Sequence, residues 1–249
     1  MIVLKSEREL TKMRQAGKIT GHILHELAAM VKPGVKTIDL DRRAEELVAQ
    51  FDAQAAFKGY QGYPGSVCVS VDNQVVHGIP GERVLQEGQI VSLDFGVVYD
   101  GFYGDSAVTV PVGSVDPEVA KLIEVTQTAL EQGIAQAVVG NRLSDIAHAV
   151  QQYVEAHNFS VVREYVGHGI GRQMHEAPPV PNYGLPNRGP RLKVGMTLAI
   201  EPMVNAGSWE VEALADGWTV VTKDGSHSAH FEHTVAILED GPEILTGWE

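Results

Sequence analysis

The sequence has little that would tie the protein to a membrane or to an oxidising compartment. Its 249 residues include one cysteine, Cys68, so no disulfide can form within the chain, which agrees with a reducing environment. No apolar run approaches the ~18 residues that cross a bilayer. The segment from Met1 to Leu10 lacks the basic-then-apolar layout and the cleavage site of a signal peptide. We therefore expect a cytoplasmic protein.

Basic residues are also scarce. The chain has 19 Lys and Arg against 32 Asp and Glu, a formal net charge of −13. Such an acidic chain is not expected to bind nucleic acids or anionic membranes in general. Aromatic residues make up only 6%, but 44% hydrophobic and 20% charged residues are typical of a folded globular protein. The length suits one large domain or two small ones.

The first part of the chain predicts two helices followed by strands. Ser6-Glu7-Arg8-Glu9 has the form of a capping box and begins a helix that Pro33-Gly34 ends. The apolar pattern then predicts a helix over residues 38–51 and strands over 67–76, 89–95 and 103–111. A tight turn at Asp100-Gly101 joins the last two strands.

The same order of elements then starts again. Asp116-Pro117-Glu118 is an N-cap followed by proline at the first helical position. A second helix is expected over 144–157, and strands near 161–166, 197–204, 218–221 and 231–239.

The two predicted helix pairs match at an offset of 106 residues. The matched positions are Gly34 and Gly140, Asp39 and Asp145, Leu40 and Ile146, Ala44 and Val150, Leu47 and Tyr153, and Val48 and Val154. We interpret this as an internal duplication, roughly 1–112 and 113–249, within a single catalytic domain spanning 1–249. The alternative is a chance likeness that any α+β protein could show. A duplication would place a site in the cleft between the two halves.

One segment is rich in proline. Five of the twelve prolines lie between Ala177 and Pro190, which excludes a regular helix or a central strand. We expect a rigid loop there, either at the rim of a cleft or elsewhere on the surface.

Two acidic residues stand in apolar segments that we expect to be neighbouring strands. Asp94 lies in Gln89-Ile-Val-Ser-Leu-Asp-Phe, and Asp105 lies near the start of the partner strand. With a two-residue turn at Asp100-Gly101, Asp105 pairs with Gly96, so both carboxylates project from one face on diagonal positions. Two adjacent negative charges in apolar strands repel each other, and something must neutralise them.

Three further residues extend this pattern. Glu201 interrupts Thr197-Leu-Ala-Ile-Glu-Pro-Met-Val, Glu232 precedes another apolar run, and His168 stands between glycines in Gly167-His-Gly. A lone acid in a strand usually lies on the solvent face, and a lone histidine is usually structural. The four acids together favour a site, because Asp94 and Glu201 interrupt runs that look buried on both faces. Glycines let a backbone bring an imidazole into such a crowded place.

Metal ions would neutralise these carboxylates. Four carboxylates carry about four negative charges, which two divalent cations balance. Oxygen-rich ligation with one imidazole suits manganese, iron(II), cobalt or zinc, and differs from a cysteine-rich structural zinc site. It also has too many carboxylates for a two-histidine, one-carboxylate iron centre. Two metals ~3.5–4 Å apart can hold a bridging hydroxide and polarise a carbonyl, which is hydrolytic chemistry.

Five features together resemble the type I methionine aminopeptidases. They are Ser92-Leu-Asp-Phe-Gly, the Asp94 to Asp105 spacing, Gly167-His-Gly-Ile-Gly, Ala199-Ile-Glu-Pro-Met and His230-Phe-Glu-His-Thr. Each is weak alone, but the ordered set is specific and covers essentially the whole chain. The resemblance implies the α+β pita-bread fold of the creatinase and aminopeptidase group, with two pseudo-symmetric halves around a central antiparallel sheet.

The resemblance also implies an enzyme that removes the initiator methionine from nascent proteins and peptides and prefers a small second residue. The ligands of its two divalent ions would be Asp94, Asp105, His168, Glu201 and Glu232. A metal-bridging hydroxide would attack the first peptide carbonyl, Glu201 would carry the proton to the leaving amine, and His175 would steady the carbonyl and the tetrahedral intermediate. His77 would contact the substrate. The substrate's free α-amine would bind the second ion, so a blocked amine should abolish cleavage.

The implied methionine pocket is apolar and polarizable, which suits a thioether. Its residues would be Tyr60, Tyr63, Cys68 and Trp218, with Phe57 and Met174 where a common bacterial pattern has cysteine and phenylalanine. These two departures could change the shape of the pocket, but the preference for methionine should survive. Without the resemblance, His77, His175 and the pocket residues would be interpreted as packing or surface residues.

Rival interpretations remain within the same fold. A proline-specific aminopeptidase usually has an additional N-terminal domain, for which 249 residues leave no room. A creatinase-like enzyme normally lacks this metal set, and a binding protein that had lost catalysis would have lost ligands. Type I follows from the absence of a zinc-binding extension and of a long insertion between His168 and Glu201. The expected partner is the nascent polypeptide. Association with the ribosome is plausible for such an enzyme, but the sequence contains no dedicated motif for it. Family analogy implies a monomer.

Overall fold

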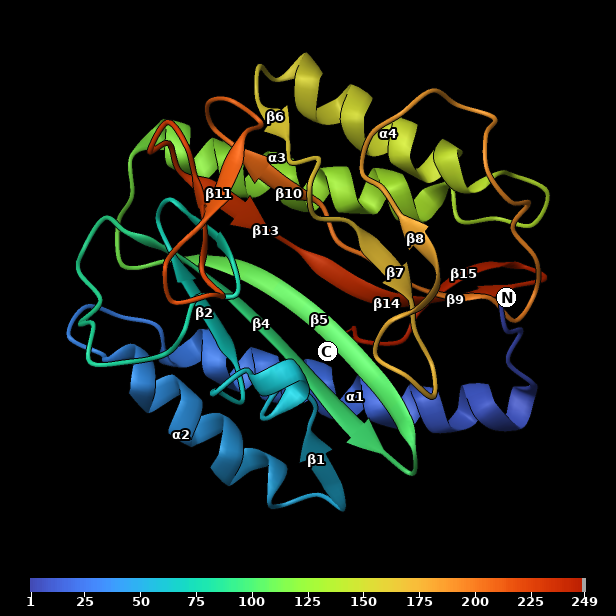
Figure 1. Ribbon diagram of the computed structural model, residues 1–249, viewed down its shortest axis with the longest axis horizontal. Coiled ribbons are helices and arrows are strands. Elements are labelled where there is room, and N and C mark those ends of the chain that lie inside the picture. Colours follow the sequence, from blue (N-terminus) through green and yellow to red (C-terminus); the bar gives the residue numbers. More distant parts are fainter. Residues whose placement is uncertain (248–249) are drawn as a thin grey trace.

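Four helices flank a curved sheet in the computed structural model, which describes residues 1–247. Helices α1 (Glu7–Met30) and α2 (Thr37–Val48) lie at the bottom of Figure 1, and α3 (Pro117–Ala135) and α4 (Leu143–Ala156) lie at the top. The strands run between the two pairs. None of the helices in the described part of the chain is long and apolar enough to cross a membrane.

The central sheet is antiparallel and has nine strands. Its main spatial order is β1 (Ala53–Ala55), β4 (Ile90–Tyr99), β5 (Phe102–Pro111), β14 (Glu232–Leu238), β9 (Thr197–Ile200), β7 (Gly167–Gly169) and β8 (Glu176–Val180). Two short strands join it at the sides: β2 (Cys68–Val71) pairs with β4, and β15 (Gly241–Ile244) pairs with β14.

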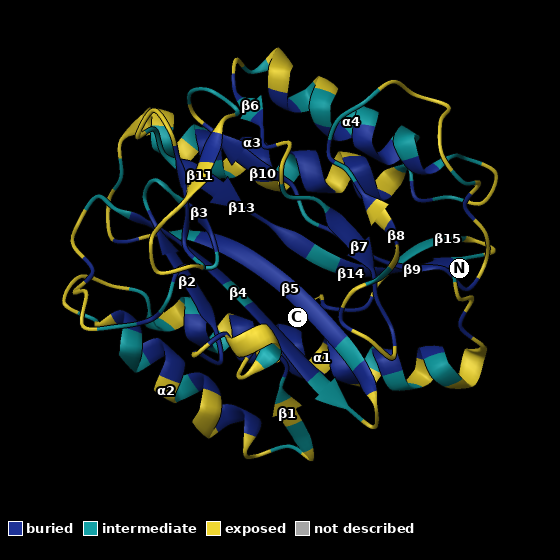
Figure 2. Cartoon of the chain, viewed as in Figure 1, coloured by how far each residue is buried: buried dark blue, intermediate teal, exposed yellow. Residues whose placement is uncertain are grey.

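Two small three-stranded sheets complete the strands. One contains β13 (Ser228–His230), β10 (Met203–Asn205) and β6 (Ser160–Val161), and the other contains β11 (Val211–Ala213), β12 (Val220–Thr222) and β3 (Gln74–Val76). A short 3₁₀ turn spans Tyr60–Gly62. Figure 2 shows that the strands at the centre are buried along most of their length, whereas the helices are exposed on their outer faces.

Local capping interactions begin the helices where the sequence predicts them. The Glu9 carboxylate accepts the N–H of Ser6 at 2.9 Å, which forms the predicted capping box of α1. At α3, the Asp116 side chain accepts the N–H of Glu118 at 2.9 Å, and Pro117 occupies the first turn. Both caps satisfy backbone groups that a helix end would otherwise leave unpaired.

Helix α1 packs directly against the hairpin of β4 and β5. Gly104 on β5 makes this close approach possible, because a Cβ there would lie 2.9 Å from the backbone of Ala16 and Gly17. The Thr20 hydroxyl reaches across to the carbonyl of Gly104 at 3.2 Å. This tight contact fixes the back of the hairpin whose other face carries two of the predicted metal ligands.

The hairpin has the predicted register. Asp94 pairs with Ala107 and Gly96 pairs with Asp105 across the turn. The prediction that both carboxylates lie on one face is therefore confirmed.

The helices α2 and α4 begin in the same way, 106 residues apart. Asp39 accepts the N–H of Lys36 at 3.4 Å, and Asp145 accepts the N–H of Arg142 at 2.7 Å. These matched starts agree with an internal duplication. The division at about residue 112 stays a prediction.

Two predicted strands are each broken into two shorter strands, and the predicted proline-rich loop begins as a strand. The expected strand over 67–76 is broken at Asp72, whose φ of +60° turns the chain, so β2 and β3 lie in different sheets. The expected strand over 197–204 is likewise split at Glu201-Pro202 into β9 and β10. The expected rigid loop at 177–190 begins as β8, which tolerates two prolines because it is an edge strand.

Candidate metal centre and substrate cavity

One cavity of about 240 Å³ gathers every residue that the sequence assigned to a site. The thirteen predicted residues on its wall are Phe57, Tyr60, Tyr63, Cys68, His77, Asp94, Asp105, His168, Met174, His175, Glu201, Trp218 and Glu232. The sequence positions of these residues span most of the chain, so only the folded sheet brings them together.

The five predicted metal ligands come from five strands or their ends. Asp94 and Asp105 lie on the hairpin strands β4 and β5, and His168 lies at the centre of β7. Glu232 is the first residue of β14 and pairs with Ala107, the same residue that pairs with Asp94. Glu201 follows β9 directly. The order of neighbouring strands therefore places all five on one patch of the sheet.

The ligand atoms are close together. The Nε2 atom of His168 lies 3.6 Å from Oε1 of Glu201 and 4.0 Å from Oδ2 of Asp105. One ligand atom each from Asp105, His168 and Glu232 falls within a 4.8 Å group, as does one each from Glu201, His230 and Glu232. Such spacing allows neighbouring groups to share a cation.

Several carboxylate oxygens at this site are buried without a hydrogen-bond partner among the described residues. They are Oδ1 of Asp94, Oδ1 of Asp105 and Oε1 of Glu232. Buried polar atoms without a partner are rare in proteins, because losing water without replacement costs free energy. A divalent cation would supply the missing interaction, so these residues fit a metal centre.

The protonation properties of the same groups agree with this interpretation. Burial raises the pKa of Asp105 to about 7. Burial together with repulsion from neighbouring carboxylates raises the pKa of Asp94, Glu201 and Glu232 well above their usual values. Burial lowers the pKa of His168 to about 4, so at neutral pH its imidazole is neutral and has a lone pair to offer a metal.

Glycines and one hydrogen bond aim His168 into the site. A Cβ at Gly167 would lie 2.3 Å from the carbonyl oxygen of Ala199, so only glycine allows β7 to approach β9 this closely. The Nδ1 atom of His168 lies 2.9 Å from the carbonyl oxygen of Gly169. This contact assigns the proton to Nδ1 and leaves Nε2 facing the carboxylates, as in many metal sites.

Two further histidines face the cavity from loops. The ring centroid of His175 lies 4.2 Å from that of His168, and its Nδ1 is 2.8 Å from the hydroxyl of Tyr60. His77 follows β3 with a φ of +59° and contacts the ring of Trp218 edge-on, with centroids 6.2 Å apart. A positive φ is unfavourable for a histidine, and such strain is often found at functional sites.

Most of the remaining cavity wall is apolar. Tyr63 and Trp218 meet edge-to-face with centroids 5.1 Å apart, and Phe57, Cys68 and Met174 belong to the same buried cluster. Burial raises the pKa of the Cys68 thiol, so it remains uncharged at neutral pH. An uncharged, polarizable wall of this kind can hold a thioether or another apolar side chain.

Side-chain hydroxyl groups join the strands beside the predicted metal ligands by hydrogen bonds. The ladder between β5 and β14 contains only two residue pairs. Beyond them, the Thr234 hydroxyl accepts the N–H of Asp105 at 3.0 Å and donates to its carbonyl at 2.8 Å. Thr109 does the same for His230, at 2.8 and 2.9 Å. The join that positions Asp105 and Glu232 is therefore made largely by side chains.

Comparison with known proteins decides the family. A sequence model of Metallopeptidase family M24 matches residues 11–239. Methionine aminopeptidase of Clostridium perfringens is 56% identical over 246 residues, covering 99% of each chain, and methionine aminopeptidase 1 of Bacillus subtilis gives the same figures. The chain belongs to the methionine aminopeptidases. The predicted family and enzyme class, a metal-dependent aminopeptidase, are thereby confirmed.

Solved structures confirm the fold. The crystal structure of methionine aminopeptidase from Thermotoga maritima matches the chain with a TM-score of 0.98 at 48% identity, covering all of both chains. Prolidase from Pyrococcus horikoshii gives a TM-score of 0.81 at 20% identity, and the match covers 65% of that longer chain. This second likeness shows the shared pita-bread fold alone.

Sequence reasoning missed several residues of the site. The cavity is also lined by Gln61, Val76, Tyr165, Val166 and Met203. His230 is 1% exposed, with Nε2 3.7 Å from Oε2 of Glu201 and no hydrogen-bond partner for either ring nitrogen among the described residues. It lies in one of the family segments, but nothing in the residue pattern separates it from a packing histidine.

Proposed function

We propose that the protein removes N-terminal methionine from peptides and nascent proteins whose second residue is small. One observation carries the proposal: five predicted metal ligands and an apolar wall share a single cavity. The names of the close relatives support the same activity. The preference for a small second residue rests on the resemblance to the family.

We propose that Asp94, Asp105, His168, Glu201 and Glu232 hold two divalent ions. Their four carboxylates balance the charge of two such ions. The mixture of oxygens and one imidazole suits manganese, iron(II), cobalt or zinc. When bound, these ions polarise a carbonyl and lower the pKa of water, which supplies a nucleophile at neutral pH.

The protein's own residues bind the substrate and move its protons. The Tyr60 hydroxyl can donate to Nδ1 of His175, which leaves the N–H at Nε2 to donate to the scissile carbonyl oxygen. Glu201 is partly exposed to the cavity, with a side-chain exposure of 14%, and its raised pKa suits a group that accepts a proton and returns it to the leaving amine. His77 contacts the substrate beside Trp218.

The methionine side chain would lie against the apolar wall of Phe57, Tyr60, Tyr63, Cys68, Met174 and Trp218. A thioether there removes apolar surface from water without leaving a polar group unpaired. We also propose that the enzyme acts as a monomer in the cytoplasm on chains emerging from the ribosome. Co-sedimentation of the purified protein with ribosomes tests the last point.

The first experiment measures release of methionine by metal-depleted protein before and after addition of manganese or cobalt. The substrates are Met-Ala-Ser, Met-Leu-Ser, N-acetyl-Met-Ala-Ser and Ala-Pro-Ser. We expect metal-dependent cleavage of Met-Ala-Ser, slower cleavage of Met-Leu-Ser, and none of the acetylated peptide, which lacks the free amine.

Two results would contradict the proposal. Cleavage of Ala-Pro-Ser without cleavage of Met-Ala-Ser would make the enzyme proline-specific. Failure to cleave any of these peptides with either manganese or cobalt would leave only a binding role.

A further inference from the structure

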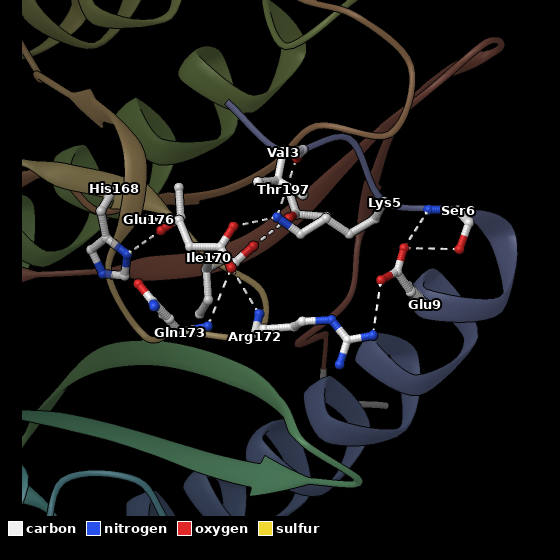
Figure 3. Close-up of polar contacts among 11 residues, drawn as sticks. Val3, Lys5, Ser6, Glu9, His168, Ile170, Arg172, Gln173, Glu176 and Thr197 are labelled. Carbon is white, nitrogen blue, oxygen red and sulfur yellow. Dashed lines mark hydrogen bonds and ion pairs between the residues drawn. The ribbon is translucent and has the colours of Figure 1, made fainter. Parts of the chain in front are cut away.

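An ammonium group is buried just outside the cavity, where the N-terminal segment crosses the loop between β7 and β8 (Figure 3). The side chain of Lys5 is only 3% exposed, and its Nζ lies 2.5 Å from Oε2 of Glu176, which is 12% exposed. Burying two opposite charges costs about as much in lost hydration as their attraction returns, so stability alone does not explain such a pair. The ion pair instead holds the N-terminal segment and the loop between β7 and β8 in a fixed relative position.

The Glu176 carboxylate holds the preceding loop in place through hydrogen bonds to its backbone. While Oε2 accepts from Lys5, Oε1 accepts the backbone N–H of Arg172 at 2.8 Å and that of Gln173 at 3.2 Å. Figure 3 shows these bonds converging on one carboxylate. The loop also leaves room for the lysine, because a Cβ at Gly171 would lie 2.3 Å from Cε of Lys5. The conformation of the turn over residues 171–175 therefore depends on the Glu176 carboxylate.

This turn carries two residues of the cavity. Met174 and His175 both line the cavity wall, and His175 is the immediate neighbour of Glu176. On the other side, the N–H of Lys5 donates to the carbonyl of Gly195 at 2.7 Å, and the N–H of Gly195 donates to Ile237 on β14 at 2.9 Å. The pair thus connects the His175 loop, through the N-terminal segment, to the strand that carries Glu232.

We propose that Glu176, held by Lys5, is a positioning residue that orients His175 toward the scissile carbonyl. This inference rests on the proposed function, because it concerns the residue that donates to the substrate. A displacement of His175 by about 1 Å would weaken that contact in the transition state more than in the bound substrate. The expected signature is a fall in kcat with little change in KM.

The test compares Glu176→Gln with Glu9→Gln in the metal-loaded enzyme. The first change keeps the size of the side chain but turns an amide toward the Lys5 ammonium. The second removes the same charge from a partly exposed residue that contacts the same loop, since Glu9 accepts from Arg172 at 3.2 Å. We expect Glu176→Gln to lower kcat for Met-Ala-Ser by about 10- to 100-fold, and Glu9→Gln to match the parent enzyme.

Combination with His175→Ala separates positioning from a general loss of structure. If Glu176 acts through His175, Glu176→Gln has no further effect on kcat once His175→Ala is present. Lys5→Met, which keeps the apolar stem, should lower kcat in the same direction and to a smaller extent. Full additivity of the two changes, or a kcat for Glu176→Gln equal to that of the parent, would overturn the proposal.

An NMR measurement keeps the proposal testable if the enzyme cleaves no methionyl peptide. The ring Cε1–H signal of His175 is assigned by its loss in His175→Ala. Glu176→Gln should shift this signal and Glu9→Gln should leave it in place. An unshifted signal in Glu176→Gln would refute the positioning role independently of the proposed function.

Discussion

Neutralising one buried carboxylate should stabilise the metal-free enzyme while removing its activity. Asp105 is 5% exposed, and burial raises its pKa from 3.8 to about 7. The folded chain therefore binds a proton at Asp105 more tightly than the unfolded chain does. Burial of this group costs nothing below pH 3.8, where it is protonated in both states, and the cost grows as pH rises to about 7.

The size of the effect follows from the shift. About three pKa units at about 1.4 kcal/mol each give a cost of about 4 kcal/mol at pH 8, and about 2 kcal/mol at pH 5. Asp105→Asn keeps the shape and removes the charge. For a chain of this length, 4 kcal/mol corresponds to a rise in Tm of about 8–16 °C.

The assay is thermal unfolding followed by circular dichroism in the presence of a chelator. The decisive quantity is the difference in Tm between Asp105→Asn and the parent, which should be larger at pH 8 than at pH 5. Using the difference cancels the contributions of titrating groups that do not interact with Asp105. Asp52→Asn, at an exposed site, is the matched control and should stay within about 0.5 kcal/mol of the parent.

Metal addition should reverse the order of stability. Manganese should raise the Tm of the parent and have much less effect on Asp105→Asn, because the variant lacks one of the proposed ligands. If Asp105→Asn is less stable than the parent at pH 8 without metal, the cost of burying the charged Asp105 carboxylate argued here is absent. The interpretation of the carboxylate cluster as a metal centre would then lose its physical basis.

Three further changes probe separate parts of the molecule. Glu201→Gln should lower kcat for Met-Ala-Ser about 10²- to 10⁴-fold, because it removes the proposed proton carrier; activity within a factor of two of the parent would reject that role. Trp218→Ala should lower kcat/KM for methionyl peptides by about 10- to 200-fold through lost apolar contact, and an equal loss with a slow alanyl substrate would point to unfolding instead. Asp41→Ala should lower the free energy of unfolding by about 1–3 kcal/mol, measured with urea, because Asp41 accepts the N–H groups of Ser66 and Val67 at 2.6 and 3.2 Å; an unchanged midpoint would mean that water replaces the carboxylate.

The sequence predicted the local parts of the site well. A turn at Asp100-Gly101 fixes the register of β4 and β5 by itself. Counting residues from this turn therefore predicted that Asp94 and Asp105 lie on the same face of the hairpin. The caps of α1 and α3 followed from side chains that reach only a few residues along the chain. Such short-range geometry needs no knowledge of the rest of the fold.

The long-range parts could not be obtained in that way. Nothing in the apolar pattern says that β14 lies between β5 and β9, which is what brings Glu232 beside Asp105. The family resemblance supplied that information instead. The breaks at Asp72 and Glu201-Pro202 were missed because apolar residues continue on both sides of each turn, and the short strands β1, β11, β13 and β15 are too brief to show a period.

The hydroxyl-bridged join between β5 and β14 has a consequence for a chain that is still being made. Asp94 and Asp105 are synthesised more than a hundred residues before Glu232. Until β14 docks, Asp94 and Asp105 must remain hydrated or protonated, because the proposed metal centre is incomplete without Glu232. If these residues hold metal as proposed, a chain that has not yet reached Glu232 lacks part of the metal centre and should not cleave peptides.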